Sequence, residues 1–261
     1  MRLCKPLLWC LLWWWSGQHL LAAECPAQLR MAYNASWRPY VEVSDETVKG
    51  RDIDLIRQLL SQVNSRLLLQ FVPEKRAMQM LQQGKVDLLF AASYTPQRAE
   101  FAWFSDAYRK EHNVVLVHSQ TLALYPELRQ RDAFLALAQR KLVGAYNPAG
   151  FYGDSFEQVK QQSAVKQRSL AVYEPERRLD LVAGRRADYT IADSEAVEVD
   201  LAQRKDKTVL QILPFHLNTA DIHLMLSKAS VPQSCVVALN RQLTVRGKKT
   251  PMAVQSVLGS D

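Results

Sequence analysis

The chain has 261 residues, of which 48% are hydrophobic and 23% are charged, and it carries a formal net charge of +7. A chain of this length and composition can bury a substantial core, in one large domain or two small ones, which excludes an intrinsically disordered protein. The positive excess is spread along the sequence rather than gathered in one run, so we expect no nucleic-acid partner.

The first 23 residues form a predicted secretory signal peptide. Arg2 and Lys5 precede an apolar stretch rich in leucine and tryptophan, and the small residues Ala22 and Ala23 follow it. A basic start, an apolar core and small residues in this order are typical of a cleavable signal. No later run approaches the roughly 20 apolar residues needed to span a bilayer. We therefore expect a secreted, soluble mature protein.

Two cysteines, Cys25 and Cys235, remain once the signal is removed. No CxxC pair or histidine cluster accompanies them, so in an oxidising compartment they indicate a disulfide rather than a metal or redox site. A lipid anchor on Cys25 is the alternative, since this cysteine stands just past the apolar stretch. Glu24 argues against the anchor, because the sequence pattern of lipid-modification sites has a small residue immediately before the cysteine.

Strands and helices alternate through the first part of the mature chain. In order, we expect a strand at residues 29–33, a helix at 50–63, a strand at 67–72, a helix at 75–84 and a strand at 86–92. Asp52 and Asp54 are predicted to cap the first of these helices. One strand followed by one helix is typical of a parallel α/β layer.

Polar side chains follow the apolar strand at residues 86–92. Ser93, Thr95, Pro96 and Arg98 come directly after it, and open α/β sheets place their ligands at the carboxyl ends of strands. A guanidinium offers paired planar donors that suit a carboxylate, and the two hydroxyls can add hydrogen bonds. In the alternative interpretation Thr95 caps a short helical turn opened by Pro96, and Arg98 is solvated.

A similar alternation begins again in the second half of the chain. In order, we expect strands at residues 112–119 and 141–146, a glycine-rich turn at 147–156 entering a helix, a strand at 168–173, a helix and strand over 175–193, strands at 209–215 and 222–228, and helices at 231–243 and 250–258. The order helix, Gly, Asp, apolar strand and polar residue appears at both 81–93 and 181–193. This repetition indicates two lobes of like design.

These features resemble the bacterial periplasmic solute-binding proteins of family 3, which bind polar amino acids. The resemblance covers nearly the whole mature chain, and its motifs are a GxxD strand, a Ser or Thr, TxxR and FSxxY. The matching residues are Gly84, Asp87, Ser93, Thr95, Arg98, Phe104, Ser105, Asp106 and Tyr108. The family implies a two-lobed α/β fold of the type II periplasmic-binding-protein class, with a ligand cleft between the lobes. We expect residues 24–111 and 216–261 to form lobe 1 and residues 112–215 to form lobe 2, inserted in lobe 1.

The resemblance also implies a clamp for a zwitterion. Arg98 is expected to bind the carboxylate, with Ala91 and Ser93 at the neighbouring strand end lining the site. Asp193, at the end of the apolar strand of the second lobe, is expected to pair with an α-ammonium. Its alternative role is to cap the following helix.

Further positions either match the family or depart from it. Trp37 stands where the family stacks an aromatic residue against the ligand, whereas Tyr40 is expected only to pin its loop. Arg76 matches an arginine of the family and is expected to line the cleft. Glu74 stands where the family has an aromatic residue. It is either a specificity residue or a solvated residue at the start of the helix. Phe151 stands where the family has a Ser or Thr that binds the ligand carboxylate. This difference leaves the identity of the ligand open.

The implied function is capture of a small zwitterionic ligand, an amino acid or a similar carboxylate, by a monomer that delivers it to an ABC permease. No HxxxH, HExxH or GxSxG arrangement is present, so we expect no enzyme, metal or cofactor. One alternative is an enzyme, because cyclohexadienyl dehydratases resemble the same family and need only a well-placed acid in the cleft. Another is a ligand-sensing protein. If both chain ends build one lobe, Cys235 can reach Cys25.

Overall fold

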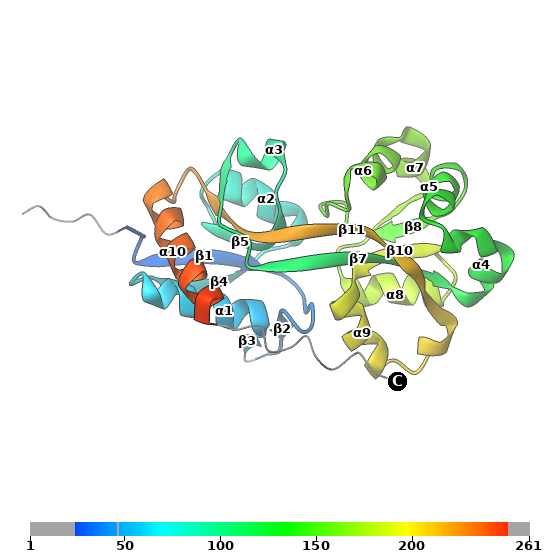
Figure 1. Ribbon diagram of the computed structural model, residues 1–261, viewed down its shortest axis with the longest axis horizontal. Coiled ribbons are helices and arrows are strands. Elements are labelled where there is room, and N and C mark those ends of the chain that lie inside the picture. Colours follow the sequence, from blue (N-terminus) through cyan, green and yellow to red (C-terminus); the bar gives the residue numbers. More distant parts are fainter. Residues whose placement is uncertain (1–23, 46, 250–261) are drawn as a thin grey trace, which may run out of the picture.

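The computed structural model describes residues 24–45 and 47–249. The predicted signal peptide at residues 1–23 and the predicted helix at residues 250–258 lie outside these ranges. Within them, no helix is long and apolar enough to cross a membrane. The chain forms the expected mixed α/β fold, with two lobes joined by a pair of long strands (Figure 1).

The first lobe is built from both ends of the described chain. Its elements are β1 (Gln28–Tyr33), β2 (Glu42–Val43), β3 (Val48–Lys49), α1 (Arg51–Gln62), β4 (Arg66–Phe71), α2 (Glu74–Gln82), β5 (Leu88–Ser93), α3 (Pro96–Ala99), β6 (Ala102–Phe104) and α10 (Gln233–Lys249). Strand β1 lies between β4 and β5 and runs parallel to both. Neighbouring residues of a strand face opposite sides of the sheet, so Met31 packs in the cluster of Ile53 from α1, and Ala32 packs with Ala77 from α2. Helices α1 and α2 thus cover opposite faces.

The first turn of α1 differs from the sequence prediction. The residue that caps this helix is Gly50, without a side-chain hydrogen bond, so the expected capping by Asp52 and Asp54 is wrong. The helix begins at Arg51, which places both carboxylates past the cap position. Asp52 points inward and is buried, and Asp54 pairs on the surface with Arg57 at 3.6 Å.

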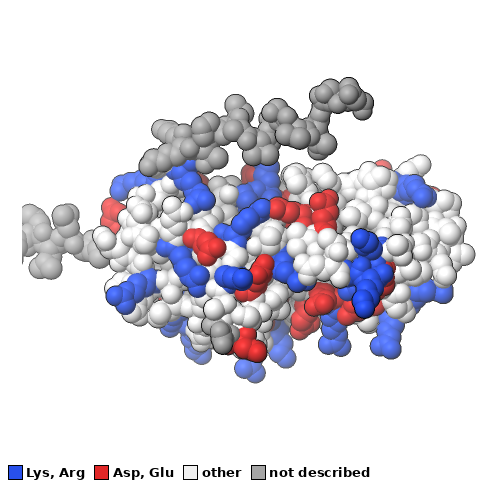
Figure 2. All heavy atoms as spheres, turned by 90° about the horizontal axis from the view of Figure 1, so that it is seen from below, with Lys and Arg blue, Asp and Glu red and all other residues white. Residues whose placement is uncertain are grey.

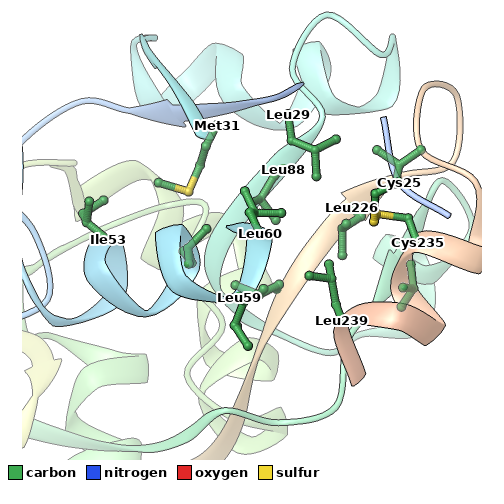
Figure 3. Packing of buried hydrophobic residues seen from close by; sticks show 14 of the residues in the cluster. Cys25, Leu29, Met31, Ile53, Leu59, Leu60, Leu88, Leu226, Cys235 and Leu239 are labelled. Carbon is green, nitrogen blue, oxygen red and sulfur yellow. A yellow bond between two sulfur atoms is a disulfide. The ribbon is translucent and has the colours of Figure 1, made fainter. Parts of the chain in front are cut away.

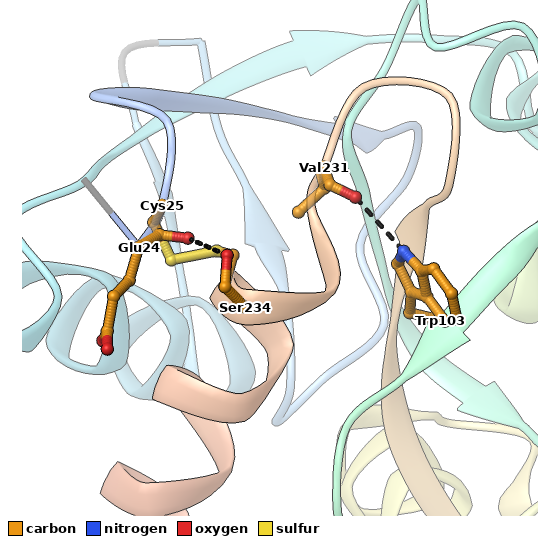
Figure 4. The surroundings of a disulfide bond; sticks show 6 residues. Glu24, Cys25, Trp103, Val231 and Ser234 are labelled. Atoms are coloured by element: carbon orange, nitrogen blue, oxygen red, sulfur yellow. Dashed lines mark hydrogen bonds between the residues drawn. A yellow bond between two sulfur atoms is a disulfide. The ribbon is translucent and has the colours of Figure 1, made fainter. Parts of the chain in front are cut away.

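A disulfide joins the two ends of the described chain within the first lobe. Cys25 precedes β1, Cys235 lies in the first turn of α10, and their Cα atoms are 4.5 Å apart. Both cysteines belong to the buried cluster formed by β1, α1, β5, β11 and α10 (Figure 3). The Ser234 hydroxyl donates to the Glu24 carbonyl at 3.1 Å beside the bond (Figure 4). This is the predicted pairing, and it engages the thiol that a lipid anchor on Cys25 would need.

The second lobe repeats the α/β design. Its elements are α4 (Ser119–Leu124), the 3-10 helix η1 (Pro126–Arg129), α5 (Arg131–Arg140), β8 (Gly144–Tyr146), α6 (Asp154–Gln161), α7 (Ser163–Arg168), β9 (Leu170–Ala171), α8 (Pro175–Ala183), β10 (Tyr189–Asp193), α9 (Ser194–Gln203) and the 3-10 helix η2 (Lys207–Val209). Strands β10, β8 and β9 are parallel neighbours. Aromatic residues dominate its core, with Phe134, Phe156 and Tyr189 fully buried and in ring contact.

Two antiparallel strands, β7 (Arg109–His118) and β11 (Leu210–Ser227), run through both lobes. They join the strands into one sheet of order β4-β1-β5-β11-β7-β10-β8-β9, with β6 paired to β11. The strands expected separately at residues 209–215 and 222–228 are therefore one strand, because the polar residues between them continue to pair with β7, as Asn218 does with Asn113. The predicted lobe boundaries at residues 111–112 and 215–216 fall inside these strands.

Charges of both signs share the face of the molecule that Figure 2 shows. Lysines and arginines there lie among aspartates and glutamates rather than in one continuous basic patch. Surface ion pairs occur in the described chain, such as Lys110 with Asp221 at 2.8 Å. A mixed face of this kind favours solubility more than attraction to a polyanion.

Candidate functional site: a cleft between the lobes

A cavity of about 230 Å³ lies between the two lobes. Its wall combines the carboxyl ends of β1 and β5 from the first lobe, those of β8 and β10 from the second, and the crossing strand β7. The cavity is lined by six of the residues expected to bind the ligand: Trp37, Ala91, Ser93, Arg98, Phe151 and Asp193. Arg76 is exposed on α2 and is not among the lining residues.

Arg98 is held in the cavity wall by the turn that follows β5. The Thr95 hydroxyl accepts from the Arg98 backbone N–H at 3.2 Å and Pro96 opens the short helix α3, as the capping interpretation predicts. The guanidinium nevertheless lines the cavity, where Nη1 donates to the Ser93 carbonyl and Nη2 donates across the cleft to the Ala149 carbonyl, both at 2.8 Å. Burial lowers the pKa of Arg98, although the group stays charged at neutral pH. No carboxylate of the described chain pairs with it.

The strand end at Ala91 is fixed from the core side. Ala91 has φ of 53°, a left-handed conformation that costs a non-glycine residue roughly 1–2 kcal/mol. Its backbone N–H donates to the Tyr108 hydroxyl at 3.1 Å, and that hydroxyl donates to Asp52 at 2.6 Å. Asp52 also accepts from Arg109 Nε at 3.3 Å. Asp52 therefore supports the wall of the cavity through Tyr108.

Asp193 ends β10 and precedes α9 in the second lobe. Its Oδ1 accepts from the Ala196 backbone N–H at 3.0 Å, so Asp193 is the cap of α9, and from the Tyr40 hydroxyl at 2.8 Å. Among the described residues, Oδ2 has no hydrogen-bond partner. One oxygen of this buried, cavity-lining carboxylate is thus held from both lobes, while the other has no partner.

The aromatic wall at Trp37 is completed by an arginine of the protein itself. The guanidinium carbon of Arg109 lies 5.1 Å from the Trp37 ring centroid and 3.9 Å from that of Tyr40. The Trp37 and Tyr40 rings are 4.6 Å apart. Tyr40 is buried in the first-lobe core, as expected, but its hydroxyl also reaches Asp193 in the second lobe.

The glycine-rich turn of the second lobe presents Phe151 to the cavity and buries Tyr152. The Tyr152 hydroxyl accepts from the Asn147 backbone N–H at 3.1 Å. The Tyr152 backbone N–H donates to Glu157 at 3.2 Å, so an acid of the protein already occupies a donor that a ligand carboxylate could otherwise use.

Glu74 lines the cavity and connects the lobes. One oxygen accepts from the Asn34 side chain at 2.9 Å, and the other accepts from the Asn147 side chain of the second lobe. Of the two interpretations of Glu74 from the sequence, the solvated helix start is not observed, because the carboxylate is half-buried between two amides.

Two charged residues in the wall, Glu111 and Arg178, were not predicted from the sequence. Burial raises the pKa of Glu111 to about 7, Arg109 opposes this rise, and Asp193 adds to it. Arg178 on α8 is buried and donates to the carbonyls of Val172 and Tyr173. In the sequence PERR at the start of α8, a buried arginine cannot be told from a solvated one by the pattern of residues.

No group of three or more His, Cys, Asp or Glu side chains that could hold a metal occurs among the residues that the structure describes. The donors and acceptors of the cavity are instead guanidinium, carboxylate, amide and backbone groups. Such a set suits a small organic ion.

Solved structures of similar fold are binding proteins for amino acids. A mutant of ArgBP from T. maritima is 18% identical, with a TM-score of 0.67 over 85% of this chain and 91% of that one. The amino acid ABC transporter substrate-binding protein AbpA from Streptococcus pneumoniae, bound to L-arginine, is 17% identical, with a TM-score of 0.66 over 85% and 90%. An ancestral amino acid-binding protein described as a precursor of cyclohexadienyl dehydratase is 17% identical, with a TM-score of 0.64 over 85% and 90%. At these identities the similarity shows the fold.

A search of curated protein sequences finds no match. The family model of the bacterial extracellular solute-binding proteins, family 3, matches residues 29–211. This match covers most of the chain and spans the strands, the turn with Arg98 and the strand ending at Asp193 that build the cleft. The chain therefore belongs to the bacterial extracellular solute-binding proteins of family 3.

Proposed function

We propose that this protein is a periplasmic binding protein that captures a small zwitterionic amino acid between its lobes and presents it to an ABC permease. One observation carries the proposal: Arg98 from the first lobe and Asp193 from the second line the same cavity, the first without a carboxylate partner and the second with a free oxygen. A carboxylate and an ammonium on one molecule satisfy both groups at once. The family and the amino-acid-binding neighbours support this choice.

The periplasmic location rests on the signal-like first 23 residues and is supported by the disulfide between Cys25 and Cys235. The permease is inferred from relatives such as AbpA, which is described as a substrate-binding protein of an amino acid ABC transporter. We expect the protein to act as a monomer that closes around its ligand.

Calorimetric titration with the twenty common amino acids tests the proposal. We expect at least one to bind. Arg98→Ala should weaken that binding by at least about 2 kcal/mol, because it removes a buried charge-assisted pair. Asp193→Asn should weaken it by about 1.5–3 kcal/mol by removing the charge that faces the ammonium.

Arg76→Ala is the matched control, since Arg76 belongs to the same lobe but is exposed and away from the cavity wall. It should leave the affinity unchanged. Unchanged affinity in a folded Arg98→Ala protein, or no binding of any amino acid by the parent, is the result that contradicts the proposal.

A second candidate function is dehydration of a cyclohexadienyl carboxylate. Glu111 favours it, because a buried acid in the cleft with a pKa of about 7 is partly protonated at neutral pH and can serve as a general acid. Incubation of the protein with such a compound separates the candidates. Recovery of the compound unchanged contradicts the enzyme, and turnover that Glu111→Gln abolishes supports it.

A further inference from the structure

We infer that Arg178 is a second anion-binding residue of the cleft, and that the ligand is an amino acid with a second acidic group on its side chain. The inference rests on the proposed function and deepens it, since it names the class of amino acid. It follows from a buried charge in the second lobe whose hydrogen bonds are incomplete.

Arg178 lies in the first half of α8 and folds back over the end of β9. Its side chain lines the cavity together with Tyr173 and Pro175, and the residue is 7% exposed. Nη1 donates to the carbonyls of Val172 at 3.2 Å and Tyr173 at 2.8 Å. Nε is buried and has no acceptor in the described chain.

A guanidinium stays charged in a protein and carries five N–H donors. Burying it without a counter-charge is unfavourable unless a partner arrives from outside. Two other well-buried guanidinium groups of the described chain lie beside acids. Arg109 has an 11% exposed side chain and pairs with Asp52 and Glu111, and Arg204 has a 14% exposed side chain and pairs with Asp180 and Asp206.

Arg98 and Arg178 have no carboxylate partner in the described chain, and both line the same cavity from opposite lobes. In the second lobe, the Phe151 side chain of the glycine-rich turn lines the cavity without a charged or hydrogen-bonding group. Lys160, near that turn, forms an ion pair with Glu157 at 2.7 Å and donates a hydrogen bond to the Gly150 carbonyl. Arg178 is therefore the cation that the second lobe contributes to the cavity wall.

The acids of the wall do not supply the missing counter-charge. Glu74 accepts from two asparagines, Glu111 lies 3.6 Å from Arg109, and Asp193 is shared between Tyr40 and the start of α9. A ligand with two carboxylates and one ammonium has one charged end for each of Arg98, Arg178 and Asp193. An acidic amino acid has this composition.

Calorimetry with matched pairs of ligands tests the inference. L-glutamate and L-aspartate are compared with their neutral counterparts L-glutamine and L-asparagine, and with cationic L-arginine. The parent should bind at least one acidic amino acid tenfold or more tightly than its amide. Arg178→Gln should remove this preference. It should lower the affinity for the acidic ligand at least tenfold and change the affinity for its amide by no more than twofold. Arg178→Lys, which keeps the charge, should retain part of the preference.

Arg168→Gln is the matched control, because Arg168 also donates to backbone carbonyls of the second lobe but does not line the cavity. It should leave all affinities unchanged. A parent that binds L-glutamine, L-asparagine or L-arginine as tightly as the acidic ligands overturns the inference whatever the variants do. Equal weakening of acidic and neutral ligands by Arg178→Gln also overturns it. Either result leaves the proposed function standing, whereas absence of binding by every amino acid overturns both.

Discussion

Arg98 and Asp87 come from one sequence motif but act differently. Arg98 lines the cavity, whereas Asp87 is buried between β1 and the turn that follows β11. Asp87 accepts from the Arg30 backbone N–H and from Nε and Nη2 of its side chain, and from the Ser230 hydroxyl, at 2.6–2.8 Å. Burial raises the pKa of Asp87, but the hydrogen bonds from Arg30 and Ser230 outweigh this effect and lower it.

Asp87→Asn should lower the free energy of unfolding by about 1–3 kcal/mol, because it replaces a charged acceptor of four hydrogen bonds with an amide. Urea denaturation measures this change. Ligand affinity should stay the same, since Asp87 does not line the cavity. The reverse pattern, with weaker binding and full stability, would show that the aspartate of the motif belongs to the site.

Glu111 makes stability depend on pH. Its pKa is about 7 in the folded protein and near 4.5 in a solvated chain, so the folded state binds the proton more tightly. Its stabilising effect is present below about pH 4.5 and is lost as the pH rises to about 7. Relative to the parent, Glu111→Gln should therefore gain about 1–3 kcal/mol in free energy of unfolding between pH 5 and pH 8. A difference that does not change with pH would contradict the shifted pKa.

The sequence predicts the cavity residues that follow strands better than those that lie within elements. Arg98 and Asp193 directly follow or end apolar strands, where chain direction brings side chains to the sheet edge. Glu111 lies inside β7, and Arg178 lies inside α8, where a charge normally marks the solvated face. Arg76 was predicted from the family pattern alone, and its position on α2 turns it to solvent.

At the scale of elements, the alternation of strands and helices was predictable because each apolar run is short and ends in Gly, Pro or polar residues. The length of β11 was not, since its polar middle around Asn218 has no strand-like pattern and is held by pairing with β7. The prediction that Asp52 caps α1 is wrong because its carboxylate accepts hydrogen bonds from Tyr108 and Arg109 instead.

The disulfide between Cys25 and α10 should contribute to stability without affecting binding. It closes a loop with a sequence separation of 210 residues, so a Cys25→Ser/Cys235→Ser variant should lose about 2–5 kcal/mol in free energy of unfolding. Neither cysteine lines the cavity, and calorimetry should show unchanged ligand affinity. Identical urea midpoints for the variant and the oxidised parent would contradict this role.

At the scale of the molecule, the lobes touch through contacts outside the cavity as well as inside it. Arg38 donates to Asp200 at 3.1 Å, and Arg51 forms two hydrogen bonds to Glu195, so the first-lobe loop at Arg38 and the start of α1 both contact α9. Because these contacts join the lobes without a ligand, we expect them to favour a closed arrangement independently of it.

Asp200→Asn combined with Glu195→Gln should shift the protein toward an open form. Two partly exposed ion pairs contribute together about 0.5–2 kcal/mol, so affinity should fall a few-fold to about thirtyfold. Small-angle scattering should show a larger radius of gyration without ligand. Asp54→Asn, which removes a pair confined to α1, is the control and should change neither quantity. Unaltered scattering and affinity in the double variant would exclude these pairs as a closure device.

In the native protein, one small molecule with a carboxylate and an amino group should lie between Arg98 and Asp193. Mass spectrometry of the compounds released on denaturing protein purified from the periplasm tests it most directly, with Arg98→Ala prepared in parallel. The parent should release a chemically unchanged amino acid in about equimolar amount, and Arg98→Ala should release much less of it. Release of a compound that lacks a carboxylate, or equal amounts from parent and variant, would contradict it.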